Sequence, residues 1–116
     1  MTSDATKATE AVFNYHMQAI GAKDVDGIME DFAEDAVVFT REGPFQGHAA
    51  IREMFVNLVG TLTPELLSTF KVERADFDGE VAFLLWSAGE FVSLATDTFV
   101  VRNGKIVAQS FVPCTS

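Results

Sequence analysis

The stretch "DTFVVRNGKIVAQSF", residues 97–111, predicts two antiparallel strands joined by a tight turn. Asn103 and Gly104 both tolerate positive φ, which a two-residue type I′ hairpin turn requires. The first strand extends back through "EFVSLATDTFVV", residues 90–101, and contains one charged residue in its middle, Asp97. A carboxylate is costly to bury among Val, Leu, Ala, Thr and Phe. Asp97 is therefore solvated, paired structurally, or part of a pocket.

The chain before this hairpin predicts further strands of the same sheet. "STFKVERADF" (68–77) alternates, "DG" (78–79) is a turn, and "EVAFLLWS" (80–87) follows before "AG" interrupts it. An earlier strand is predicted at residues 36–40, where "REGP" (41–44) then turns the chain. These segments predict an antiparallel meander in the C-terminal half.

Three helices are predicted in the N-terminal half. Residues 4–20 have apolar side chains on well over half of a helix circumference, with Ser3 or Asp4 as the cap and Gly21 at the end. A short helix starts at Asp24, and a third follows Gly47. With the strands, this order predicts an α+β fold: one domain, residues 1–116, with helices laid over one face of a curved sheet.

Composition excludes several classes of function. The 116 residues are 48% hydrophobic, with a net charge of −9 and no cluster of basic residues, so nucleic acid and anionic membranes are poor partners. No apolar run approaches the roughly 18 residues of a membrane span, and the N-terminus lacks a secretory pattern. The single cysteine, Cys114, cannot form an internal disulfide. We expect a cytoplasmic protein.

Motifs for metals and cofactors are missing. There is no phosphate-binding glycine loop and no HExxH, and the two histidines have no cysteine partners. "DVDG" (24–27) lacks the later ligands of a calcium loop. We expect neither a cofactor nor a metal.

Asp97 is the first candidate for a functional site. Alternation places Ser93, Ala95 and Phe99 on its face of the strand, and the two small residues predict a hollow beside it. Tyr15 lies on a face of the first helix that is otherwise lined by alanines, so the two polar groups are expected to share a pocket. The alternative is that Asp97 bonds a neighbouring threonine or a backbone N–H.

"YHMQAIGAKDVDGIMEDFAEDAVVF" (15–39), "GPFQGHAAIREMF" (43–55) and "DTFVVRNGKIVAQSF" carry a family resemblance. The chain resembles the nuclear transport factor 2-like superfamily, which includes ketosteroid isomerase and the SnoaL-like polyketide cyclases. The resemblance implies a cone: a curved sheet wrapped around the first helix, with a cavity inside, usually in a homodimer. It is specific for the fold but not for the function, because this fold hosts many unrelated activities.

The resemblance to ketosteroid isomerase also implies roles for single residues. Tyr15 and Asp97 fall on that family's oxyanion-hole tyrosine and aspartate, the latter kept protonated at pH 7 by an apolar site. Thr40 falls where that family has its general-base aspartate, and its hydroxyl cannot shuttle a proton between carbons. Glu42, two residues on, is either a replacement base or part of an exposed turn. The resemblance therefore implies the oxyanion hole of that reaction but not its general base.

Other residues are predicted to contact a substrate, with their alternatives open. His16 faces the cavity as an acid or base, or is a core histidine; Trp86 lies on the inner or the outer face of the sheet. The full set of predicted substrate-binding residues is Thr40, His16, Phe55, Trp86, Phe99 and Gln109. The acidic cluster of Asp31, Glu34 and Asp35 is predicted to be solvated surface.

Three functions remain. The first is an enzyme, an isomerase, cyclase or lyase that acts on a small apolar carbonyl compound through an enolate-like intermediate. The second is a non-catalytic module that binds a small apolar ligand. The third is an association domain that forms a homodimer through the outer face of the sheet. A ligand-sized cavity and a raised pKa at Asp97 favour the first.

Overall fold

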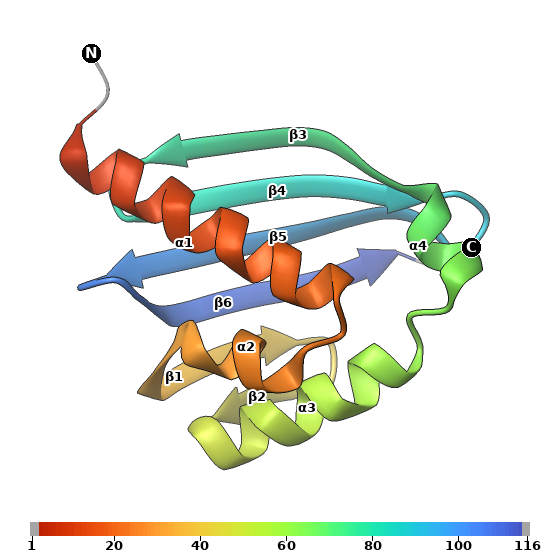
Figure 1. The fold of residues 1–116 in the computed structure, drawn as a ribbon, viewed down its shortest axis with the longest axis horizontal. Helices are drawn as coiled ribbons and strands as arrows, with labels where there is room; N and C mark the ends of the chain where they lie inside the picture. Colours follow the sequence, from red (N-terminus) through yellow and green to blue (C-terminus); the bar gives the residue numbers. More distant parts are fainter. Residues whose placement is uncertain (1–2, 115–116) are drawn as a thin grey trace.

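The computed structural model describes residues 3–114, which form four helices and six strands (Figure 1). In chain order they are α1 (Asp4–Gly21), α2 (Val25–Glu30), β1 (Phe32–Thr40), β2 (Gly43–Gln46), α3 (His48–Gly60), α4 (Pro64–Thr69), β3 (Phe70–Asp78), β4 (Val81–Ala88), β5 (Val92–Arg102) and β6 (Lys105–Cys114).

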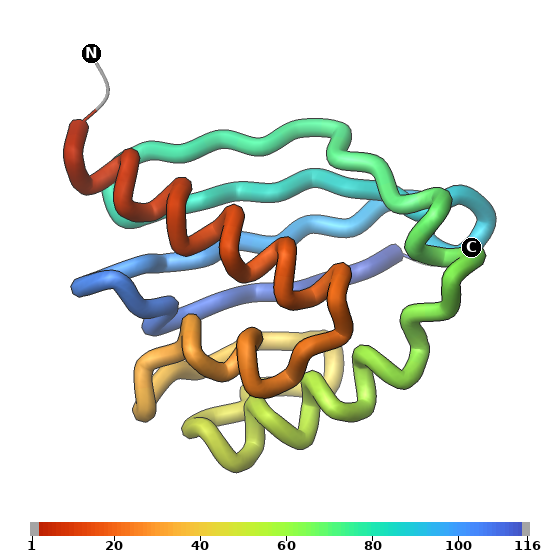
Figure 2. The backbone as a smooth tube through the Cα atoms, in the orientation of Figure 1, coloured from red at the N-terminus to blue at the C-terminus, as the bar shows by residue number. Residues whose placement is uncertain are grey.

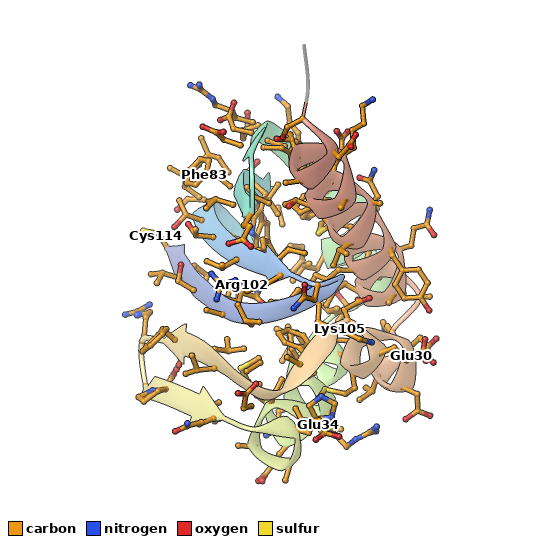
Figure 3. All side chains as sticks on the ribbon, turned by 90° about the vertical axis from the view of Figure 1, so that its left-hand side faces the viewer. Glu30, Glu34, Phe83, Arg102, Lys105 and Cys114 are labelled. Carbon is orange, nitrogen blue, oxygen red and sulfur yellow. The ribbon has the colours of Figure 1, made fainter. Side chains whose placement is uncertain are left out.

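The six strands make one sheet in the order β2-β1-β6-β5-β4-β3. Every neighbouring pair is antiparallel except β1 and β6, which are parallel. The sheet is curved, its two edges do not meet, and the helices lie on one face of it (Figures 1 and 3). The predicted α+β fold, with helices over one face of a curved sheet, is confirmed.

Helix α1 runs obliquely across the sheet, as the tube in Figure 2 shows. Ser3 caps its start, because its Oγ accepts a hydrogen bond from the N–H of Thr6 at 3.1 Å. Its buried residues, Thr9, Phe13, His16 and Ala19, recur every three or four positions and form one stripe. Thr9 Oγ1 also donates to the carbonyl oxygen of Gly79 at 2.6 Å, which ties α1 to the β3–β4 turn.

The hairpin between β5 and β6 has the predicted turn. Asn103 and Gly104 have φ values of 54° and 77°, the positive values of a type I′ turn. The turn sets the register in which Phe99 pairs with Gln109 and Asp97 with Phe111. The inward-facing side chains of the two strands are therefore neighbours.

Three segments differ from the prediction. Strand β1 begins at Phe32 rather than residue 36, with a register shift between Phe32 and Val37 that interrupts its alternation. The predicted turn at residues 41–44 is shorter, because Gly43–Gln46 returns as β2 and pairs with β1. Helix α4 was not predicted, although Thr63 is its cap and Pro64 stands in its first turn, both typical helix-start residues.

The core lies between the helices and the covered face of the sheet. Aromatic rings fill much of it: Phe13 packs edge-on against Phe77 and Phe99, at centroid distances of 5.1 and 5.6 Å. The largest fully buried side chains include Phe32, Phe55, Phe99, Ile28, Ile51, Leu84 and Ile106. The core leaves a hollow beyond them, among α1, α3, α4 and strands β4 to β6.

Candidate functional site

The hollow is a cavity of about 80 Å³, lined mainly by apolar side chains. Four polar side chains reach it: His16 from α1, Trp86 from β4, Asp97 from β5 and Gln109 from β6. A small number of polar groups that converge in an otherwise apolar hollow is typical of small-molecule sites.

Asp97 is held by two hydrogen bonds from neighbouring strands. Trp86 Nε1 donates to its Oδ1 at 2.9 Å, and Gln109 Nε2 donates to its Oδ2 at 3.0 Å. The sheet positions both donors, because Asp97 pairs with Leu84, two residues from Trp86, and with Phe111, two residues from Gln109. The question raised by the sequence is answered: Asp97 is 7% exposed, is paired, and lines a cavity.

Burial raises the pKa of Asp97 from 3.8 to about 6, while the hydrogen bonds from Trp86 and Gln109 and the charge of His16 act in the opposite direction. At pH 7 the carboxyl is therefore mostly ionised. This differs from the expected neutral acid, because both of its oxygens accept a hydrogen bond and so favour the charged form. A carboxyl with a pKa near neutrality is suited to accept and return a proton.

His16 faces the same cavity and is buried, at 2% exposure. Phe32, Phe55 and Phe99 surround its ring edge-on, with centroids 5.3–5.9 Å away. Its Nδ1 lies 3.3 Å from Oδ2 of Asp31, the distance of a charge pair, although the geometry falls short of a hydrogen bond. The pair leaves Nε2 as the ring nitrogen available to a bound molecule.

Asp31 was predicted to be solvated, and that prediction is wrong, because its side chain is buried against His16. Glu34 and Asp35 are exposed, as expected. Asp31, the C-cap of α2, follows the buried Ile28 by three residues, which is the spacing of one helix face. That spacing was the signal from which the burial of Asp31 could have been predicted.

Tyr15 does not join Asp97 in this cavity. Its side chain is 46% exposed, and its hydroxyl donates to Glu30 Oε2 at 3.1 Å. This hydrogen bond raises the pKa of Tyr15 above its ordinary value. The expected proximity of Tyr15 and Asp97 is therefore wrong. The buried stripe of α1 passes through His16, and Tyr15, the residue before it, points about 100° away around the helix.

Thr40 lies outside the cavity, in an open groove of about 920 Å³ between α3, the β1–β2 hairpin and the end of β6. Its Oγ1 donates to the carbonyl oxygen of Gly43 at 3.0 Å. Glu42 lines the same groove and is exposed. Met54, Leu58 and Phe111 line both the groove and the cavity, so these side chains form the wall between them.

The structure thus brings together six of the eight predicted site residues and separates the other two. Trp86 lies on the inner face, which settles the open alternative. Ser93, expected beside Asp97, is exposed and donates to the carbonyl oxygen of Cys114, because β4 and β5 shift register between Trp86 and Ala88. The cavity-lining residues among those predicted are His16, Phe55, Trp86, Asp97, Phe99 and Gln109.

Two structural observations concern metals and membranes. Within residues 3–114, no group of three or more His, Cys, Asp or Glu side chains is placed to hold a metal ion. None of the helices in this range has both the length and the apolar character that crossing a bilayer requires.

Comparison with known proteins identifies relatives by family and by fold. The family model described as SnoaL-like domain matches residues 13–109. No curated protein matches the chain in sequence. A nuclear transport factor 2-like protein of unknown function from Mesorhizobium loti has a similar structure, with a TM-score of 0.80, 15% identity, and coverage of 98% of this chain and 97% of that one. A proposed polyketide cyclase from Sinorhizobium meliloti gives a TM-score of 0.69 at 24% identity, covering 87% and 93%.

Proposed function

The chain belongs to the SnoaL-like domain family, and on that premise we propose that its cavity binds a small molecule with which Asp97 and His16 exchange protons. One observation carries the proposal: a buried carboxyl with a pKa near 6 and a buried imidazole face the same apolar cavity. Ionisable groups with shifted pKa values are enriched at functional sites.

Asp97 acts as the base. Its ionised carboxylate removes a proton from a carbon atom next to a carbonyl group of the substrate. Trp86 and Gln109 hold the carboxylate in place through their hydrogen bonds, so little reorganisation is needed.

His16 acts on the carbonyl oxygen, where negative charge develops. In the form that carries a proton on each ring nitrogen, Nε2 donates a hydrogen bond to this oxygen, while Nδ1–H remains next to the Asp31 carboxylate. Return of the proton from Asp97 to another carbon gives an isomerisation, and loss of a leaving group gives a lyase reaction. This division of roles replaces the predicted one, in which Tyr15 and a neutral Asp97 stabilise the oxyanion.

Proton exchange tests the proposal without knowledge of the natural substrate. Cyclopentanone is small, apolar and enolisable, and its α-protons exchange slowly in D2O, so NMR can follow their loss with and without protein. We expect the protein to accelerate the loss and Asp97→Asn to reduce the acceleration at least about 100-fold, the usual contribution of a general base. Tyr15→Phe is the control, because the Tyr15 hydroxyl lies outside the cavity and its removal should leave exchange unchanged.

The same experiment distinguishes the alternative, a non-catalytic binding module. Trp86 lines the cavity and is the only tryptophan, so its fluorescence reports binding. Binding without accelerated exchange supports the module. Acceleration that persists in Asp97→Asn contradicts the assigned base, and the absence of both binding and exchange contradicts the proposal.

We also propose that the outer face of the sheet forms a homodimer. Apolar side chains on that face are roughly half exposed, among them Phe39, Val81, Leu94 and Val112, and Phe83 lies on the side away from the helices (Figure 3). Leu94 and Val112 lie close together on the paired strands β5 and β6, and contiguous exposed apolar side chains mark association sites. Light scattering after size exclusion should give a dimer mass for wild type and a monomer mass for Leu94→Lys combined with Val112→Lys; a wild-type monomer at micromolar concentration contradicts the dimer.

A further inference from the structure

We propose that Gln109 selects the ligand of the cavity by accepting, at its Oε1, a hydrogen bond from a hydroxyl group of the bound molecule. This inference rests on the proposed binding function, but it does not depend on proton transfer.

The orientation of the Gln109 amide is determined by Asp97. Gln109 is 4% exposed, and its Nε2 donates to Asp97 Oδ2 at 3.0 Å. The reversed amide would place Oε1 against the carboxylate oxygen, where two acceptors repel each other. Oε1 is therefore held as an acceptor on the other side of the amide.

Oε1 is buried and has no hydrogen-bond partner in the part of the chain that the structure describes. Buried carbonyl oxygens are nearly always satisfied in folded proteins, so this atom requires a donor. The other polar side chains of the cavity do not supply one: Trp86 Nε1 donates to Asp97, and neither ring nitrogen of His16 is hydrogen-bonded to Oε1. A donor on the bound molecule meets the requirement.

The surroundings of Gln109 define the rest of the ligand. The cavity is small, and apart from its four polar side chains its lining is apolar, with Phe99 and Leu84 among the fully buried members. It suits a single small ring or chain end that carries one hydroxyl, such as a phenol, an enol or a hydroxylated ketone. Any larger remainder of the molecule would extend past Met54, Leu58 and Phe111 into the open groove.

Three matched probes test the inference: phenol has a donor, benzonitrile has only an acceptor, and fluorobenzene has neither in useful strength. Their affinities are measured at pH 8 from amide chemical shifts in NMR titrations. We expect wild type to prefer phenol over each of the others about tenfold, the value of one net hydrogen bond. Tyr15→Phe is the control and should keep this preference.

Two variants separate Gln109 from general packing. Gln109→Met has a similar length without Oε1, so phenol should lose its advantage. In Asp97→Asn the new amide can donate to Oε1, which reverses the Gln109 amide and turns its Nε2 toward the cavity; benzonitrile should then gain relative to phenol. Asp97→Asn keeps Gln109 unchanged, so it still tests the inference if Gln109→Met does not fold.

Each outcome decides the inference. Equal affinities of wild type for all three probes, or an unchanged phenol preference in Gln109→Met, overturns the role of Gln109 while leaving the proposed binding function intact. Failure of all three probes to bind overturns both.

Discussion

Trp86 and Asp97 are joined across two neighbouring strands: the indole N–H donates to the carboxylate at 2.9 Å, and the two residues are diagonal neighbours on the covered face of the sheet. The only tryptophan of the chain is therefore in direct contact with the buried acid. This contact makes the ionisation of Asp97 observable by fluorescence.

We predict that the fluorescence of Trp86 titrates with a midpoint near pH 6. Protonation of Asp97 removes the negative charge next to the indole N–H, and burial places the pKa of this carboxyl at about 6. Asp97→Asn should abolish the transition. His16 faces the same cavity, so His16→Gln is the control. If the fluorescence transition persists in Asp97→Asn but disappears in His16→Gln, it belongs to the histidine instead.

Stability should also depend on the ionisation of Asp97. The folded-state pKa of about 6 lies above the unfolded value of 3.8, so this group stabilises the fold fully below pH 3.8, and its contribution is lost as the pH rises through 6. Between pH 5 and 7.5 the loss is about 1 kcal/mol. Urea denaturation of wild type and Asp97→Asn should show this as the difference between their pH slopes; parallel slopes would contradict the raised pKa.

The buried pair of Asp31 and His16 predicts unequal effects of two substitutions at Asp31. Asp31→Leu leaves His16 Nδ1 buried without its partner and should lower the free energy of unfolding by about 1–3 kcal/mol. Asp31→Asn retains an acceptor oxygen and should cost less than the leucine variant. Chemical denaturation measures both, and equal losses would show that the contact between the two side chains contributes nothing.

Phe111 should act as a wall between the cavity and the groove. It lines both and stacks on Trp86, with centroids 6.4 Å apart and ring planes 6° from parallel. Phe111→Ala should join the two spaces, raise quenching of Trp86 by acrylamide, and destabilise the protein by about 1–3 kcal/mol, since the ring is only partly buried. Phe91→Ala, at an exposed phenylalanine, should leave the quenching unchanged; equal quenching in both variants would contradict the wall.

The turn between β5 and β6 can be tested with two glycines. A Cβ at Gly104 meets open space, but the φ of 77° is unfavourable for alanine, so Gly104→Ala should destabilise by about 1 kcal/mol. Gly60, the last residue of α3, also has open space and no positive φ, so Gly60→Ala should be neutral or slightly stabilising. Thermal unfolding compares the two variants directly, and melting temperatures that shift in the same direction in both would argue against the type I′ turn.

Much of the fold could be read from local patterns. Local patterns correctly predicted the first three helices and the C-terminal hairpins, among them the apolar spacing of residues 4–20 and the Asn103-Gly104 pair. These signals are local, because a turn type depends on two residues and a helix face on spacings of three and four. The resemblance then supplied the arrangement that local patterns leave open.

The site required the tertiary structure, and α1 shows why. Tyr15 and His16 are neighbours in the sequence, but the rotation of α1 on the sheet buries His16 and exposes Tyr15. Asp31 is buried by His16, fifteen residues away, and the pKa of Asp97 depends on side chains from β4, β6 and α1 together. By itself the sequence determined most of the elements, though not α4 or β2, and that Asp97 is unusual. Only packing decided which polar groups meet Asp97, because burial and charge contacts depend on residues that are distant along the chain.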